Sequence, residues 1–393
     1  MSNIDYAIIT QTDDLSAFCQ RAAAFPSITI DTEFIRERTY YPRLCLIQIA
    51  TDDEAVIVDP MADGISLEPL IELLNNEHVL KVFHAARQDL EIFYHLSGKI
   101  PHPVFDTQVA AMVCGFGESV GYEGLVRQLT GDQIDKSSRF TNWAQRPLTQ
   151  KQLDYAVSDV THLRIVYAKL AKKLEQTDRI SWIKEEMAEL VAESTYDVHP
   201  EEAWQRLKLR TRSPQFLIMV QAIAQWRETV AQKIDVPRGH VLKDEAVMDI
   251  AASKPKAVAD LQKIRGMNRG LDKALLQDLI DVVAEAKAKP KSQAPEAPPT
   301  RDMPPESRAA IELLRVLLKR QCDNKNVAQK LVATRNELEL AAIGKLDQTH
   351  LAHGWRWEVF GKQASLLLDG KLGLTLNAKK GAVELIAQDE ILD

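Results

Sequence analysis

The sequence has few cysteines and no long apolar run, and both absences limit what the chain can be. Its 393 residues include 4 cysteines, which are scattered and never in CxxC spacing (Cys19, Cys45, Cys114 and Cys322). That distribution argues against a disulfide framework and against a zinc site. No apolar run approaches the roughly 18 residues of a membrane span, and the N-terminus lacks the basic and apolar regions of a signal peptide. We therefore expect a soluble protein of the reducing cytoplasm.

An excess of positive charge is also absent. The formal net charge is -7, which does not by itself indicate a nucleic-acid-binding protein. Binding depends on local patches rather than on total charge, however. Basic clusters are present at Arg36, Arg38 and Arg43 and in "RLKLRTR" at 206–212. A solvated surface is the simpler interpretation of either cluster taken alone.

The pattern of apolar residues divides the chain, which is long enough for two or three domains. Strand and helix patterns alternate over the first 170 or so residues, and the strand pattern disappears from about Pro200. We predict an α/β domain with a mixed sheet over 1–200 and an all-helical unit over 208–290. A Pro/Ala/Lys-rich linker over 291–305 and a second helical unit over 306–385 follow. The tail "KLGLTLNAKKGAVELIA" is consistent with a small hairpin.

Five polar side chains stand in otherwise apolar surroundings. In "SITIDTEF" the β-branched residues favour a strand, so Asp31 and Glu33 point to the same face, about 7 Å apart. Asp89 lies on an apolar helical stretch, "VFHAARQDLEIF", where a lone acid is costly to bury without a partner or a cation. Tyr155 and Asp159, in "YAVSDVTHL", are four residues apart and share one helix face.

Four acids from three separated elements indicate a metal site. Four carboxylates cannot share an apolar site without countercharge. Oxygen ligands select Mg²⁺ or Mn²⁺ over zinc, and two such ions about 4 Å apart suit in-line attack on a phosphodiester. We therefore predict a site for two divalent ions held by Asp31, Glu33, Asp89 and Asp159.

The same segments resemble a known family. "DTEF", "HAARQDLEIF" and "YAVSDVTHL" resemble the three motifs of the DEDD exonuclease superfamily, and Tyr155, four residues before Asp159, resembles its DEDDy branch. The flanking "TYYPRLCLIQIA" and "NWAQRPLTQKQLDYAVSD" resemble the bacterial ribonuclease D family, in which Asn142 is often Asp. The segment 213–287 resembles an HRDC domain, and the C-terminal unit resembles its more divergent second copy.

The resemblance implies a fold and an activity. The fold would be an α/β ribonuclease H-like exonuclease domain, with a mixed sheet flanked by helices, followed by two all-α HRDC-type domains. The activity would be metal-dependent 3′→5′ exoribonuclease cleavage that releases nucleoside 5′-monophosphates. The substrates would be RNAs with a free 3′ end, namely tRNA precursors and other small structured RNAs.

It also implies roles for the five residues. Asp31, Glu33 and Asp159 would hold the ion that activates the attacking water, and Asp31 would bridge to a second ion with Asp89. Tyr155 would orient the water, because a phenol with a pKa near 10 is a poor general base.

Contacts with the substrate are less specified. Phe34 and His84 are near enough to the motifs to touch the terminal nucleotide, with core packing as the alternative for both. Basic residues of the first helical unit would contact phosphates (Arg238, Lys263, Arg265 and Arg269). The alternative is that this unit only packs on the catalytic domain. The linear layout suggests a monomer with no required protein partner and no membrane.

Two other functions fit the same motifs. One is a DNA 3′→5′ exonuclease on the same fold, which the ribonuclease D-like flanking segments disfavour. The other is an inactive RNA-binding scaffold, which the five intact side chains disfavour.

Overall fold

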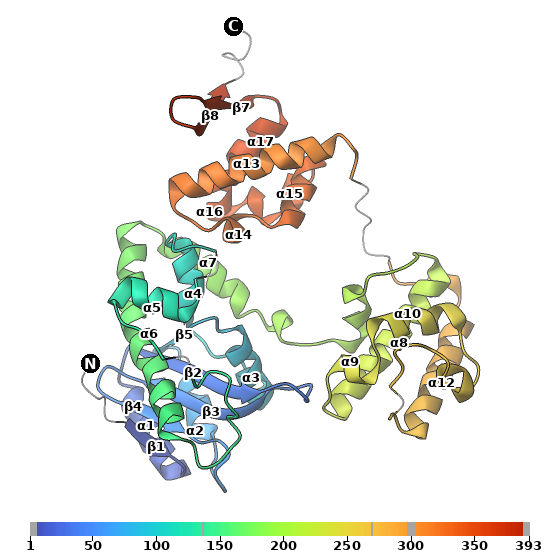
Figure 1. Ribbon diagram of the computed structural model, residues 1–393, viewed down its shortest axis with the longest axis horizontal. Coiled ribbons are helices and arrows are strands. Elements are labelled where there is room, and N and C mark those ends of the chain that lie inside the picture. The colour runs from blue at the N-terminus through green and yellow to red at the C-terminus, as the bar shows by residue number, and fades with distance from the viewer. Residues whose placement is uncertain (1–5, 119, 136, 269, 297–302, 388–393) are drawn as a thin grey trace.

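The computed structural model describes residues 6–118, 120–135, 137–268, 270–296 and 303–387. These residues fold into three units, shown from blue to red along the chain in Figure 1. Residues 1–5 of the expected first domain and 297–302 of the expected linker lie outside the described residues.

The first unit is built on a six-stranded sheet in the order β1-β4-β3-β2-β5-β6. Strand β3 runs antiparallel to both of its neighbours, and the other pairs are parallel. The predicted mixed sheet is therefore confirmed. The strands are β1 (Tyr6–Ile9), β2 (Ser27–Ile35), β3 (Arg43–Ala50), β4 (Ala55–Val58), β5 (Leu80–Phe83) and β6 (Val104–Asp106).

Helices cover both faces of this sheet (Figure 1). The longest, α6, has 27 residues and begins with a capping box in which Thr149 and Gln152 satisfy each other's backbone N–H groups. The helices are α1 (Thr12–Ala22), α2 (Glu68–Leu74), α3 (Arg87–Ser97), α4 (Thr107–Val113), α5 (Tyr122–Thr130), α6 (Gln150–Gln176) and α7 (Ile180–Leu190).

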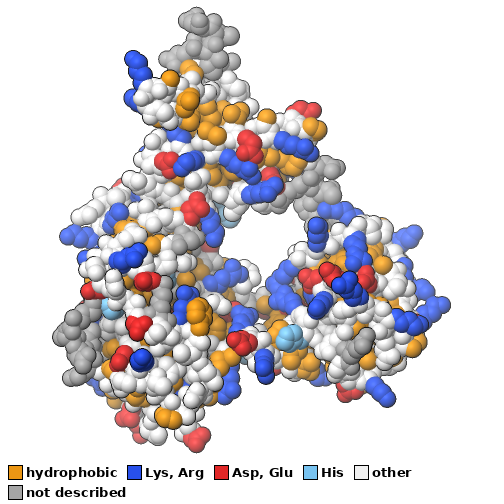
Figure 2. All heavy atoms as spheres, viewed as in Figure 1, with side chains coloured by type: hydrophobic (Ala, Val, Ile, Leu, Met, Phe, Trp, Pro, Cys, Tyr) orange, Lys and Arg blue, Asp and Glu red, His pale blue; other side chains and the backbone are white. Residues whose placement is uncertain are grey.

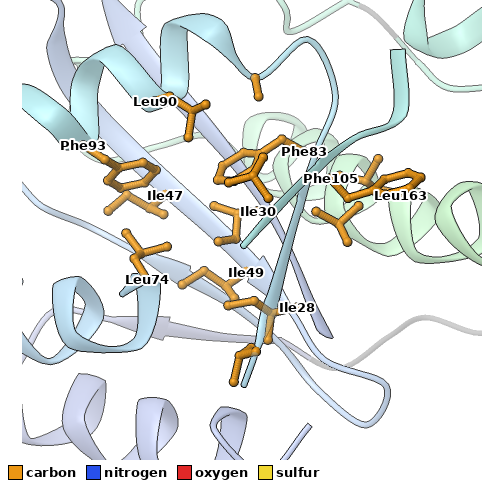
Figure 3. Close-up of a cluster of buried hydrophobic side chains, with 14 of the residues drawn as sticks. Ile28, Ile30, Ile47, Ile49, Leu74, Phe83, Leu90, Phe93, Phe105 and Leu163 are labelled. Atoms are coloured by element: carbon orange, nitrogen blue, oxygen red, sulfur yellow. The ribbon is translucent and has the colours of Figure 1, made fainter. Parts of the chain in front are cut away.

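Alternation along β2 gives each sheet face its own partner. Ile28 and Ile30 point into the core that contains Leu90 and Phe93 of α3, as Figure 3 shows. The opposite face packs on α6, and the Thr29 hydroxyl on that side donates to the Val160 carbonyl at 2.8 Å. Residues of β2 therefore face α3 and α6 in turn.

The second and third units have separate apolar cores and are mainly helical. The second contains α8 (Pro214–Lys233), α9 (Arg238–Val241), α10 (Asp244–Ser253), α11 (Val258–Leu261) and α12 (Lys273–Ala288). The third contains α13 (Ser307–Lys325), α14 (Gln329–Val332), α15 (Arg335–Ala342), α16 (Gly354–Arg356) and α17 (Lys362–Leu368).

The third unit also carries an antiparallel hairpin of β7 (Leu372–Asn377) and β8 (Ala382–Ala387). The hairpin predicted for the tail is confirmed, and the all-α description of this unit is wrong over that segment. Leu374 and Leu385 pack against the helices, and the Arg320 side chain donates to the Val383 carbonyl at 2.7 Å. Among the described helices, none combines the length and the apolar character needed to cross a membrane.

Candidate active site

A cavity of about 420 Å³ lies where β2 ends between α3 and α6. Its walls come from the end of β2, the turn between β5 and α3, the first turns of α3, α4 and α5, the loop after α5, and α6. All five polar residues singled out in the sequence line it: Asp31, Glu33, Asp89, Tyr155 and Asp159.

Strand β2 delivers two of the acids to the α6 side of the sheet. Asp31 and Glu33 pair with Gln48 and Leu46 of β3, and a β-bulge follows between Glu33 and Phe34. Bulges bend a strand and re-aim its side chains, and they are common beside active sites. The two carboxylates therefore share one face, as predicted, just before the strand changes direction.

Helix α6 brings Asp159 to the same place. Oxygen atoms of Asp31, Glu33 and Asp159 all lie within 4.8 Å of one another. The helix is held here by the bond from Thr29 to the Val160 carbonyl and by the Tyr122 hydroxyl, which donates to the Asp159 carbonyl. Tyr155, one turn earlier, is half-buried beside these acids.

Asp89 approaches from the other face of the strand. It is buried on α3 and accepts a hydrogen bond from the hydroxyl of Thr32, which lies between Asp31 and Glu33 in β2. It is not one of the three residues whose oxygen atoms meet within 4.8 Å. Its charge nevertheless contributes to raising the pKa of Glu33.

The four acids have too little positive charge beside them to ionise together. Burial raises the pKa of Asp31 to about 7. Burial and then the neighbouring acids raise the pKa of Glu33 to about 10. The pKa values of Asp89 and Asp159 also lie well above the usual range, first because of burial and then because of Asp31. These shifts mean that the folded chain resists ionising all four groups together.

The donor set fits hard divalent cations. Asp159 Oδ1 is buried and has no hydrogen-bond partner among the described residues. Clustered carboxylate oxygens are the ligands that Mg²⁺ and Mn²⁺ prefer. A cation there would satisfy this orphan oxygen and offset the repulsion among the acids.

Asp106, which organises the turn before α3, was not predicted from the sequence. The carboxylate of Asp106, at the end of β6, accepts backbone N–H groups of Ala85 and Ala86 at 3.0 and 2.8 Å. It also caps α4 through Gln108 and Val109. An Asp before a helix is a local N-cap signal, so the cap on α4 could have been predicted. Its hydrogen bonds to the β5–α3 turn join segments far apart in the chain, and no local signal predicts them.

The two proposed nucleotide contacts of the first unit do line the cavity. His84 places Nδ1 3.0 Å from the Thr107 hydroxyl, and burial lowers its pKa to about 4, so the ring is neutral at neutral pH. Phe34 is half-buried at the bulge.

The basic residues named in the second unit do not line the cavity. Arg238 lies 3.5 Å from Glu228, and Lys263 lies 3.4 Å from Asp260. Arg265 is exposed, and Arg269 lies outside the described residues. Their contact with a substrate stays a prediction.

Two parts of the chain match known protein families. Residues 6–175 match the family model described as a 3'-5' exonuclease, and residues 218–283 match the HRDC domain. The second HRDC copy stays a prediction. Together with the carboxylate cavity, these matches define a 3′→5′ exonuclease with an appended helical domain.

Relatives along the whole chain narrow this class. Ribonuclease D of Jannaschia sp. (strain CCS1) is 50% identical over 95% of this chain and 97% of the relative. That of Nitrobacter hamburgensis is 46% identical over 96% and 98%. The crystal structure of Escherichia coli RNase D, described as an exoribonuclease involved in structured RNA processing, superposes with a TM-score of 0.82. It is 29% identical over 93% of this chain and 99% of that chain.

The chain therefore belongs to the ribonuclease D family of 3′→5′ exoribonucleases. This membership confirms the resemblance and the hydrolytic activity predicted from the three motifs.

Proposed function

We propose that the carboxylate cavity binds two divalent ions, Mg²⁺ or Mn²⁺, and shortens structured RNAs from the 3′ end, tRNA precursors among them. The observation that carries this proposal is the meeting of Asp31, Glu33 and Asp159 oxygens within 4.8 Å, in a cluster where Asp31 and Glu33 are half-buried and Asp159 is buried. Each cleavage would release a nucleoside 5′-monophosphate.

Each residue of the site has its own role in this proposal. Asp31, Glu33 and Asp159 would hold one ion, and Asp31 with Asp89 would hold the second. When bound, such ions lower the pKa of the attacking water and offset charge on the leaving 3′ oxygen. Tyr155 orients the water through its neutral hydroxyl, because burial and the acids raise its pKa above the usual range.

Three further observations support an RNA substrate and the cellular setting. The similar E. coli enzyme is described as acting in structured RNA processing. The HRDC unit presents exposed basic side chains such as Arg265 that can contact phosphates. All four cysteines are free and buried, which is consistent with the reducing cytoplasm that we propose. We also propose that the protein acts as a monomer.

The test uses a 5′-labelled RNA hairpin with a short single-stranded 3′ tail and its DNA counterpart. We expect a ladder that shortens from the 3′ end of the RNA in Mg²⁺, stops near the stem and is lost in EDTA. Asp31→Asn should abolish it, whereas Asp53→Asn, the same change at an exposed acid outside the cavity, should not.

Two results would favour the alternatives. Faster shortening of DNA would indicate a DNA exonuclease. RNA binding without shortening in either Mg²⁺ or Mn²⁺ would indicate a scaffold.

A further inference from the structure

A tight turn at the mouth of the cavity displays an arginine and a phenylalanine. Thr141 closes the turn by donating its N–H and its hydroxyl to the Ser138 carbonyl, at 3.2 and 2.7 Å. Arg139 and Phe140 therefore occupy the two central positions. Both line the cavity that contains the carboxylates.

The turn is anchored on both sides. Ser138 is buried, and the Gln152 side-chain amide, at the start of α6, donates to the Thr141 hydroxyl at 3.1 Å. Two residues later, Trp143 is buried, with its ring centroid 6.1 Å from that of Tyr155. The tip is consequently held in register with the helix that carries Tyr155 and Asp159.

Phe140 is exposed to an unusual degree for its type. Its exposed fraction is 89%, the highest among the large apolar side chains that the structure describes as exposed. Such exposure brings no folding benefit, because the ring gains stability only when it leaves water. A flat ring beside a site for single-stranded RNA ends is a stacking surface, since every base presents a π face.

Arg139 supplies the charge that the substrate needs. Among the described residues lining the cavity, it is the one Arg or Lys. Its charge reaches the acids, because it lowers the pKa values of Glu33 and Asp159 against the larger effect of burial. Its guanidinium also lies 5.1 Å from the centroid of the Phe140 ring. A phosphate entering an acidic cavity is attracted to such a cation.

We propose that the 139–140 tip is a substrate clamp, in which Phe140 stacks on a base of the RNA 3′ end and Arg139 contacts an adjacent phosphate. This inference rests on the proposed function, and it assigns positioning residues that none of the three sequence motifs includes. Neither side chain takes part in the proton transfers or the bond cleavage. Both act on the binding and register of the strand.

Kinetics on the tailed RNA separate this role from a structural one. Phe140→Ala should raise KM about 10-fold and leave kcat within about twofold, because stacking holds the strand without touching the reacting atoms. Phe140→Trp and Phe140→Tyr should restore KM, whereas Phe140→Leu, apolar but unable to stack, should not. Leu376→Ala, at a 66% exposed residue of β7, is the matched control and should match wild type.

An abasic RNA tests the stacking partner directly. With the base removed at the stacked position, wild type and Phe140→Ala should have equal KM values; scanning the abasic site over the last three nucleotides locates that position. Arg139→Ala should weaken binding and lower the slope of log K against log salt by about 0.7, the contribution of one phosphate contact on a single strand.

The outcomes separate the two proposals. Equal KM values for wild type and Phe140→Ala, rescue by Phe140→Leu, or an unchanged difference on every abasic RNA would overturn the clamp while leaving an active exoribonuclease. A folded wild-type protein that leaves the RNA intact would overturn the proposed function and the clamp together. Unfolding of Phe140→Ala does not confuse the test, because the Tyr and Leu variants give the same comparison.

Discussion

At the scale of single residues, the clustered acids lower the stability of the metal-free folded state when they ionise. Asp31 and Glu33 hold protons more tightly in the folded chain than in the unfolded chain, since burial raises both pKa values, to about 7 and about 10. As the pH rises above about 4 the unfolded chain loses these protons first. The metal-free folded state therefore loses stability from about pH 4 to 7 through Asp31, and on to about pH 10 through Glu33.

The first prediction follows from that repulsion. Asp31→Asn should raise the melting temperature of the metal-free protein at pH 8 by about 2–4 °C, and Mg²⁺ should no longer raise it further. Thermal unfolding in EDTA and in Mg²⁺ measures both effects. A variant that is less stable than wild type in EDTA would show that the acids do not repel one another in the folded chain.

The second prediction concerns Tyr155. Tyr155→Phe should lower kcat about 100-fold and leave the Mg²⁺-induced rise in melting temperature intact, because the hydroxyl orients water and holds no ion. The wild-type rate, measured as a function of pH, should show no change due to tyrosine ionisation up to pH 10, since the pKa of Tyr155 is raised. A Mg²⁺ response lost with the hydroxyl would assign Tyr155 to metal binding instead.

At the scale of elements, one carboxylate organises the turn that starts α3. Asp106 binds the N–H groups of Ala85 and Ala86 and also caps α4. Ala85 takes a positive φ of 59° in this turn, a strained conformation for a residue with a Cβ. The hydrogen bonds to Asp106 hold the turn, and with it the helix that carries Asp89.

The third prediction is a loss of both stability and activity in Asp106→Asn. In the variant, one carboxylate oxygen becomes an NH2 group, which cannot accept a hydrogen bond from the backbone N–H groups that point at it. The free energy of unfolding should therefore fall by about 2–3 kcal/mol. Activity should fall more steeply than for Asp59→Asn, which breaks the ion pair with Arg146 outside the cavity. Urea unfolding and the exonuclease rate measure the two effects. Full activity would show that the turn does not depend on this carboxylate.

The elements that the sequence predicts are those with a local cause. Alternation in β2 places Asp31 beside Glu33, and helical spacing places Tyr155 beside Asp159, so neither pair depends on distant residues. The convergence of the three segments is predicted from four acids in apolar surroundings, which can share a site only with countercharge, and the family resemblance adds the role of each acid. The hydrogen bonds from the β5–α3 turn to Asp106, and the placement of Arg139 and Phe140 at the carboxylate cavity, depend on tertiary contacts that no local pattern encodes.

At the scale of the whole molecule, the three units are joined by specific contacts. Tyr40, in the loop between β2 and β3, packs into the core of the second unit, where its hydroxyl donates to Glu228. Trp182 of α7 stacks on Trp355 of the third unit, with ring centroids 4.5 Å apart. Figure 2 shows an open gap between the three units, with Lys and Arg side chains along parts of its rim.

The fourth prediction concerns the contact between the first and third units. Arg356 and Glu186 form a buried ion pair at 2.7 Å, with side chains 9% and 7% exposed. Arg356→Met leaves the buried Glu186 without its cationic partner and with only the Trp355 indole N–H, at 3.3 Å, as a donor, so stability should fall by about 3–5 kcal/mol. The double variant Glu186→Gln with Arg356→Met should recover part of that loss. X-ray scattering should show a larger radius of gyration for the single variant, and an unchanged radius and melting temperature would contradict a structural role for the pair.

The proposed activity depends on a metal site formed by the acids at the end of β2. Crystals grown in Mn²⁺ test it most directly, because anomalous scattering locates manganese without reference to activity. We expect one anomalous peak among Asp31, Glu33 and Asp159 and a second between Asp31 and Asp89. A cavity without a peak at saturating Mn²⁺, or manganese bound only elsewhere on the chain, would contradict it.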